Sequence, residues 1–179
     1  MKKSVLRRSM SGVAMAGAAL LLIGIGCNIA GARVNTTRSI AVGLYWATTA
    51  PLEKGAYVMF CPPDAPIFRE AKLRGYIGGG FCPGGYGYVM KRVAAVAGDT
   101  VSMTENGFMV DGSVLPLSRA LTTDKAGRSL PHFQANHYTL RGPELLLMSD
   151  VSATSFDGRY FGPINRDQIQ GVIRPILTW

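Results

Sequence analysis

The sequence predicts a mostly β domain that is preceded by one N-terminal transmembrane helix. An uncharged run from Ser9 to Ala32 stands near the start of the chain. Beyond it, short segments rich in β-branched and aromatic residues alternate with turns that contain glycine, proline or asparagine. Only the segment 64–74 is typical of a helix there, with Asp64 as its N-cap. A length of 179 residues favours one folded domain, at residues 33–179.

Residues 1–32 are expected to anchor the chain in a membrane. Four basic residues precede an apolar run at 12–32, which suits a transmembrane helix of about 20 residues. Because basic flanks stay in the cytoplasm, residues 33–179 should lie on the outer side. A cleaved signal peptide is the alternative, since Ala30-Gly31-Ala32 has the small-x-small pattern of a cleavage site. Cleavage would leave a soluble domain outside the membrane.

The charge of the chain argues against nucleic-acid binding. The formal charge is +8 at pH 7, but all four basic residues of the first 32 belong to the anchor segment. The remaining 15 basic and 11 acidic residues give only +4. No basic run or recognition-helix pattern occurs in the sequence. Nucleic acid is therefore not an expected partner.

Cys61 and Cys82 are the only cysteines outside the apolar run. On the outer side of a membrane such a pair is often oxidised, and the bond would close the segment 62–81. Two free buried thiols are the alternative. A zinc site is not expected, because neither His132 nor His137 is placed in a ligand motif with the cysteines. No metal or other cofactor is predicted.

The elements of the domain follow in order along the chain. Glycine makes up seven of the thirteen residues at 75–87, which without a phosphate-loop signature predicts a mobile loop. The segment 100–110 is typical of a hairpin, because two short β-branched runs flank Asn106-Gly107. The segment 116–137 is polar and irregular. Strands are predicted at 40–46, 56–61, 88–97, 144–148 and 171–178.

Lys91 is the first candidate for chemistry. On a strand side chains alternate between faces, so Lys91 shares its face with Val89, Val93 and Ala95. Apolar neighbours remove water from the amine and lower its pKa. A neutral amine can accept a proton from a serine hydroxyl. The alternative is a lysine on an edge strand whose amine reaches water.

Four segments resemble the sequence boxes of the type I signal peptidases. The strand with Lys91 is similar to their lysine box, and Ser39 stands where their nucleophile stands, seven residues beyond the apolar run. The other two segments are 55–63 and Ser155-x-Asp157-Gly158-Arg159. The closer resemblance, over nearly all of 33–179, is to the TraF-type conjugative transfer peptidases. It rests on 61–63, 80–88 and 149–162.

The resemblance implies a signal-peptidase-like β-fold catalytic domain with a serine–lysine dyad. Ser39 would attack the scissile carbonyl and Lys91 would accept its proton. Thr37 and the amide of Ser39 would bind the oxyanion. Signal peptidases carry Met-x-Pro after the serine, whereas this chain has residues 40–43 with the sequence Ile-Ala-Val-Gly, so the backbone there is not taken over from that family.

Asp157 resembles the acidic residue that supports the dyad. A carboxylate beside Lys91 would raise the lysine pKa and oppose desolvation. Asp157 is therefore expected to position the dyad, through Ser155 or Arg159. A purely structural Asp157–Arg159 pair is the alternative. A Ser–His–Asp triad that uses His132 or His137 is the rival catalytic arrangement.

The implied function is that of a membrane-anchored serine endopeptidase in the inner membrane, with its domain in the periplasm. Its implied substrate is the pilin of a conjugative secretion system, cut near the C-terminus and, in this branch, joinable into a ring. Components of the secretion channel are further expected partners. The alternatives are a general signal peptidase and a non-catalytic envelope scaffold that binds pilin. A related cytoplasmic autoproteolytic repressor is not expected, because residues 1–32 lack a DNA-binding motif.

Overall fold

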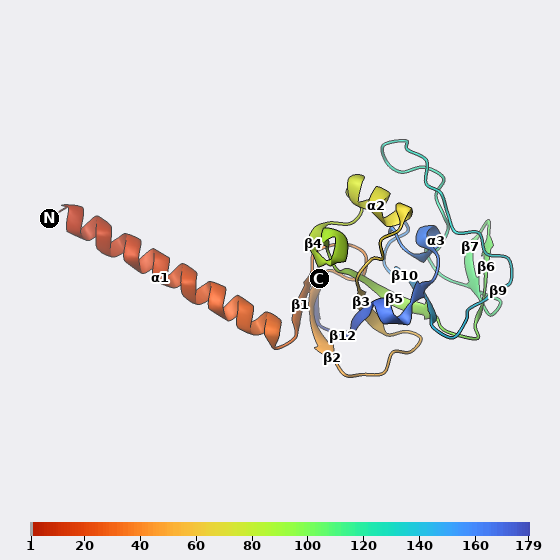
Figure 1. Ribbon diagram of the computed structural model, residues 1–179, viewed down its shortest axis with the longest axis horizontal. Helices are drawn as coiled ribbons and strands as arrows, with labels where there is room; N and C mark the ends of the chain where they lie inside the picture. The colour runs from red at the N-terminus through yellow and green to blue at the C-terminus, as the bar shows by residue number, and fades with distance from the viewer. Residues whose placement is uncertain (1) are drawn as a thin grey trace.

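A long helix and two antiparallel sheets make up the structure, which is a computed structural model (Figure 1). It describes the backbone of residues 2–179 and the side chains from residue 13 onward. The helices are α1 (Lys2–Ile29), α2 (Pro66–Leu73) and α3 (Gly158–Phe161), with 3-10 turns η1 (Pro83–Gly85) and η2 (Arg166–Gln168). The strands are β1 (Ala32–Asn35), β2 (Gly43–Thr48), β3 (Tyr57–Phe60), β4 (Gly79–Cys82), β5 (Val89–Ala95), β6 (Thr100–Thr104), β7 (Gly107–Val110), β8 (Ser113–Val114), β9 (Tyr138–Thr139), β10 (Glu144–Met148), β11 (Ile164–Asn165) and β12 (Ile169–Thr178).

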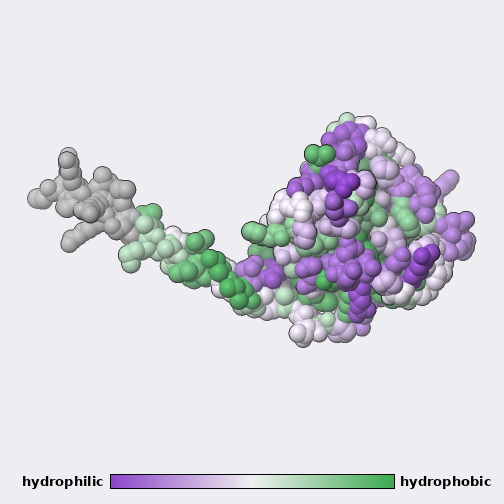
Figure 2. All heavy atoms as spheres, viewed as in Figure 1, coloured by the Kyte–Doolittle hydropathy of each residue, from purple (hydrophilic) through white to green (hydrophobic). Residues whose placement is uncertain are grey.

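Helix α1 covers the segment predicted as the anchor and projects away from the sheets (Figure 1). Its described side chains are exposed, and many of them are apolar (green in Figure 2). Within the part of the chain that the structure describes, no helix combines the length and the apolar character needed to cross a bilayer.

The larger sheet has the strand order β1-β2-β12-β3-β5-β10-β11. Strand β5 pairs with β3 on one side and with β10 on the other, all antiparallel. Lys91 therefore lies on a central strand, opposite Val58 of β3. The alternative, a lysine on an edge strand whose amine reaches water, is therefore wrong. Lys91 is buried within the domain.

Two hydrophobic clusters cover the faces of this sheet. Helices α2 and α3 bring Phe68 and Phe161 against Phe60 of β3 on one face. Ile40 and Tyr45 pack with residues of β3, β5 and β12 in a second cluster. The smaller sheet, of order β8-β7-β6-β9, contains the predicted hairpin and encloses a third cluster around Phe108. The mostly β prediction is confirmed.

Several local predictions differ from the structure. Residues 32–35, for which no strand was predicted, form strand β1 on β2. The N-cap of α2 is Ala65, and Asp64 instead forms an ion pair with Arg69. The glycine-rich segment contains β4 and η1, where a Cβ on Gly80 would lie 2.7 Å from the Cα of Gly87. Glycine there permits close backbone pairing, which the prediction of a mobile loop had missed.

Candidate active site

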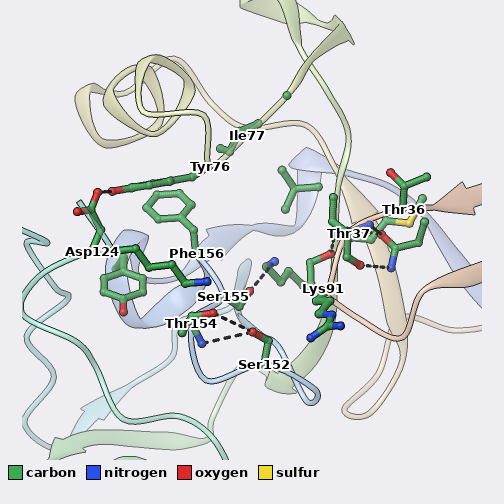
Figure 3. Close-up of a pocket in the computed structure, with 18 of the residues that line it drawn as sticks. Thr36, Thr37, Tyr76, Ile77, Lys91, Asp124, Ser152, Thr154, Ser155 and Phe156 are labelled. Carbon is green, nitrogen blue, oxygen red and sulfur yellow. Dashed lines mark hydrogen bonds between the residues drawn. The ribbon is translucent and has the colours of Figure 1, made fainter. Parts of the chain in front are cut away.

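A cavity of about 540 Å³ opens beside the central strand β5. The loop between β1 and β2 lines one end of it, including Ser39. Lys91 and Ser155 lie in the middle, and Asp124 lies at the end opposite Thr37 (Figure 3). Ser39, Lys91 and Ser155, which are far apart in the chain, are thus brought to one cavity, as the resemblance implies.

Lys91 is almost fully buried, with 2% of its surface exposed. Its Nζ donates a hydrogen bond to Oγ of Ser155 at 3.0 Å (Figure 3). Burial lowers the pKa of Lys91 to about 8. The nearby carboxylate of Asp157 opposes this shift and the guanidinium of Arg159 adds to it, but desolvation is the largest effect. At neutral pH a fraction of this amine is therefore free to accept a proton.

The hydroxyl of Ser39 lies next to that of Thr37, with 3.0 Å between the two oxygens. Ser39 is half-buried and lines the cavity together with Lys91. Ser39 is hydrogen-bonded to Thr37, whereas Lys91 is hydrogen-bonded to Ser155.

Asn35 is a site residue that the sequence analysis missed. Its buried side chain is 4% exposed and organises the loop that carries Ser39. The Nδ2 group donates to the carbonyl oxygens of Thr37 (2.7 Å), Ile40 (3.0 Å) and Ala41 (2.9 Å). Its Oδ1 accepts from the backbone N–H of Thr37 and is 3.0 Å from the hydroxyl of Thr37. No signal in a single sequence separates such an asparagine from a solvated one.

Asp157 and Arg159 form a fully buried ion pair. The guanidinium donates from Nε to Oδ1 at 2.7 Å and from Nη2 to Oδ2 at 2.8 Å. Asp157 also accepts from the backbone N–H of Ser149. Arg159 in turn donates to the carbonyl oxygens of Ala153 and Ser152, just before Ser155. Through Arg159, Asp157 thus holds the segment that leads to Ser155, the hydrogen-bond partner of Lys91. Its negative charge also raises the pKa of Lys91.

Local sequence explains how Asp157 reaches this position. It is the N-cap of α3, where its side chain accepts from the backbone N–H of Arg159. The next residue must be small, because a Cβ on Gly158 would lie 2.9 Å from the carbonyl oxygen of Leu147. The α3 turn can therefore lie directly against β10, and this close approach buries the ion pair.

The remaining sequence candidates lie outside the cavity. The sulfur atoms of Cys61 and Cys82 are bonded and tie the end of β3 to β4. Neither His132 nor His137 is among the residues that line the cavity, so no histidine is placed to act on Ser39 there. Among the described side chains, no group of three or more potential metal ligands occurs.

Comparison with known proteins identifies the family. The family described as signal peptidase, peptidase S26, matches residues 5–179. Plasmid transfer protein TraF of Escherichia coli is 62% identical over 175 residues, which are 98% of each chain. Conjugal transfer protein TraF of Agrobacterium fabrum is 33% identical over 181 residues, 99% of this chain and 98% of its own.

A crystal structure of a signal peptidase I from Enterococcus faecalis matches 71% of this chain and all of its own. Its TM-score of 0.41 and identity of 16% are too low to assign a fold or a function to this chain. The family match and the two TraF proteins are sufficient, and family membership implies a serine peptidase. The chain belongs to the signal peptidase family, peptidase S26, and within that family it is of the TraF type.

Proposed function

We propose that the protein is a serine endopeptidase in which Ser39 is the nucleophile and Lys91 the general base. The observation that carries the proposal is the buried amine of Lys91, whose pKa is lowered to about 8, in the same cavity as Ser39. Lys91 accepts the proton as Oγ of Ser39 attacks the scissile carbonyl, and passes it to the leaving amine. Water then hydrolyses the acyl-enzyme.

Thr37 and the backbone N–H of Ser39 bind the oxyanion in this mechanism. The hydroxyl of Thr37 lies 3.0 Å from that of Ser39, in the cavity that both residues line, which supports this role. A single donor of this kind contributes about 3 kcal/mol to transition-state stabilisation. Asp157 positions the dyad through Arg159 and the segment that ends at Ser155.

The proposed substrate is the pilin of a conjugative transfer system, cut near its C-terminus. The names of the two TraF relatives, which place them in plasmid and conjugal transfer, support this assignment. The acyl-enzyme can also be resolved by the pilin's own N-terminal amine, which closes a ring. Components of the secretion channel are proposed to bring pilin and enzyme together.

Mass spectrometry of the pilin from cells with wild-type protein, with Ser39→Ala or without the protein tests this function. A mature pilin that lacks C-terminal residues is expected only with wild-type protein, and a ring weighs one water less than the linear product. A non-catalytic scaffold would leave pilin processing unchanged in Ser39→Ala. A general signal peptidase would instead affect many exported precursors.

We also propose that residues 1–32 hold the domain at the periplasmic face of the inner membrane. Their apolar run and basic flank support this, and Ser39 follows closely after them. Deletion of residues 1–32 should leave cleavage of a short soluble peptide intact and slow the processing of membrane-embedded pilin. N-terminal sequencing after fractionation gives Met1 at the membrane for an anchor. A soluble chain that starts near Arg33 would instead indicate a cleaved signal peptide.

A further inference from the structure

The cavity carries more positive than negative charge. Four basic residues and one acidic residue line it: Arg38, Lys91, Lys125 and Arg128 against Asp124. Lys91 is assigned to proton transfer, and Arg38 adjoins the nucleophile in sequence. Lys125 and Arg128 come from the irregular insert and line the cavity together with Asp124, which lies at the end away from Thr37 (Figure 3). The proposed catalytic mechanism does not use these two cations.

Asp124 does not neutralise the charges of both Lys125 and Arg128. Its carboxylate accepts hydrogen bonds from the hydroxyl of Tyr76, from Nε of Arg128 (2.7 Å) and from the backbone N–H groups of Ala126 and Arg128. These contacts, that of Tyr76 first, hold the pKa of Asp124 well below its usual range. Lys125 makes no ion pair with any described side chain. Its ammonium is therefore available to a ligand.

The segment that presents Lys125 is held in place by the domain. Residues 122–130 form a small hairpin, in which Thr123 bridges Ser129 and the N–H of Leu130 bonds to Thr122 (turquoise, beyond α2 in Figure 1). Arg74 donates to the carbonyl oxygen of Ser129 at 2.7 Å, and Tyr76 donates to Asp124. The backbone that carries Lys125 is thus held at the rim of the cavity.

An aromatic wall lies between the hairpin and the dyad. The rings of Phe156 and Tyr160 are stacked with centroids 5.9 Å apart, and Tyr76 lies 5.7 Å from Phe156. All three line the cavity (Figure 3). A peptide that passes from Ser39 along this wall would meet an apolar surface first and then the free cation.

We propose that Lys125 binds a carboxylate of the peptide substrate, at a position that we call the carboxylate subsite. The proposal rests on the peptidase function proposed above and adds a substrate class to it. The carboxylate has two possible sources, an Asp or Glu side chain near the scissile bond or the free C-terminus of the substrate. Because Lys125 is remote from the reacting atoms, its contact acts on KM more than on kcat.

The test uses quenched fluorescent peptides of one length, cleaved by the full-length protein in detergent. Each peptide is made with Glu or Gln at the tested position and with a free or amidated C-terminus. Lys125→Ala should lower kcat/KM about fivefold for the peptides with the recognised carboxylate, mostly through KM. It should leave the peptides without that group unchanged. The Glu/Gln and acid/amide pairs identify which carboxylate is bound.

Two matched variants complete the design. Arg141→Ala removes an exposed cation outside the cavity and should have no effect on any peptide. Lys125→Glu should reverse the preference, so that a peptide with Lys at the recognised side-chain position becomes the better substrate. Equal loss on all peptides in Lys125→Ala, or no loss on any, would overturn the subsite.

Binding separates this proposal from the peptidase proposal. Fluorescence anisotropy with Ser39→Ala measures peptide affinity without cleavage, and Ser39→Ala/Lys125→Ala provides the comparison. A carboxylate preference that disappears in the double variant supports the subsite even if the wild-type protein cuts no peptide. Cleavage without such a preference supports the peptidase and rejects the subsite.

Discussion

The amine of Lys91 donates its hydrogen bond to the hydroxyl of Ser155, at 3.0 Å, and not to that of Ser39. Ser155 is itself 8% exposed, so both partners are shielded from water. Arg159 holds the carbonyl groups just before Ser155, and Asp157 holds Arg159. The direction of the lysine amine therefore depends on a chain of buried polar contacts that begins in α3.

Ser155→Ala should lower kcat about 10- to 100-fold with little change in KM, because the amine of Lys91 loses the contact that orients it. Ser155→Thr keeps the hydroxyl and should retain most of the activity. Steady-state kinetics on a soluble peptide provides the measurement. Full activity of Ser155→Ala would show that Lys91 is oriented by other contacts.

The rate should rise with pH through a pKa of about 8, the value for Lys91. The shift is downward from 10.5, so the neutral, proton-accepting form appears at lower pH than for an exposed lysine. At pH 7 about a tenth of the enzyme carries the neutral amine. Lys91→Arg should be inactive, since a guanidinium stays charged at any workable pH. A flat profile of kcat/KM from pH 6 to 9, or an active Lys91→Arg, would end the assignment.

Asn35→Ala should reduce kcat about 10- to 100-fold, because three backbone carbonyls in the loop that carries Ser39 lose their common donor. Asn35→Asp should not restore activity, since it keeps an acceptor for Thr37 but faces the carbonyls with a second oxygen. Asn106→Ala, in an exposed turn, is the matched control. A change confined to thermal stability would make Asn35 a structural residue only.

Asp157→Asn should destabilise the domain by about 3 kcal/mol, because it leaves the buried guanidinium of Arg159 without a counter-charge. For a domain of this size the expected fall in Tm is roughly 6–12 °C. Asp64→Asn removes an exposed pair with Arg69 and should cost less than about 1 kcal/mol. Thermal unfolding of both variants makes the comparison.

The same variant separates the electrostatic from the structural effect of Asp157. The carboxylate raises the pKa of Lys91 against desolvation. Its removal should therefore move the midpoint of the pH–rate profile of the remaining folded enzyme to lower pH. A midpoint that stays in place would mean that the charge of Asp157 does not reach the lysine.

Reduction of the bond between Cys61 and Cys82 should destabilise the domain by about 3 kcal/mol, since the bond spans a sequence separation of 21. Denaturant unfolding with and without reductant measures the loss. Intact mass after alkylation of the native protein checks the bond itself. Two thiols that alkylate without reductant would contradict it.

Local sequence was sufficient wherever a short pattern determines a conformation. The alternation along 88–97 placed Lys91 on an apolar face, and the structure buries it there. Asn106-Gly107 between two β-branched runs predicted the β6–β7 hairpin. For the hairpin the deciding contacts lie within a few residues of each other along the chain. The burial of Lys91 also requires β3 and β10 on either side of its strand, so local sequence predicted only which face the side chain is on.

Contacts between distant segments were decided only by the tertiary structure. Burial of Asn35 depends on how β1 pairs with β2, where the sequence analysis predicted no strand. The buried side chain supports the loop that carries Ser39. The contact of Tyr76 with Asp124 joins residues 48 positions apart and directs the hairpin toward the cavity. Polar residues of this kind carry no periodic signal, because what they bind, and whether water reaches them, is determined by the packing of the whole chain.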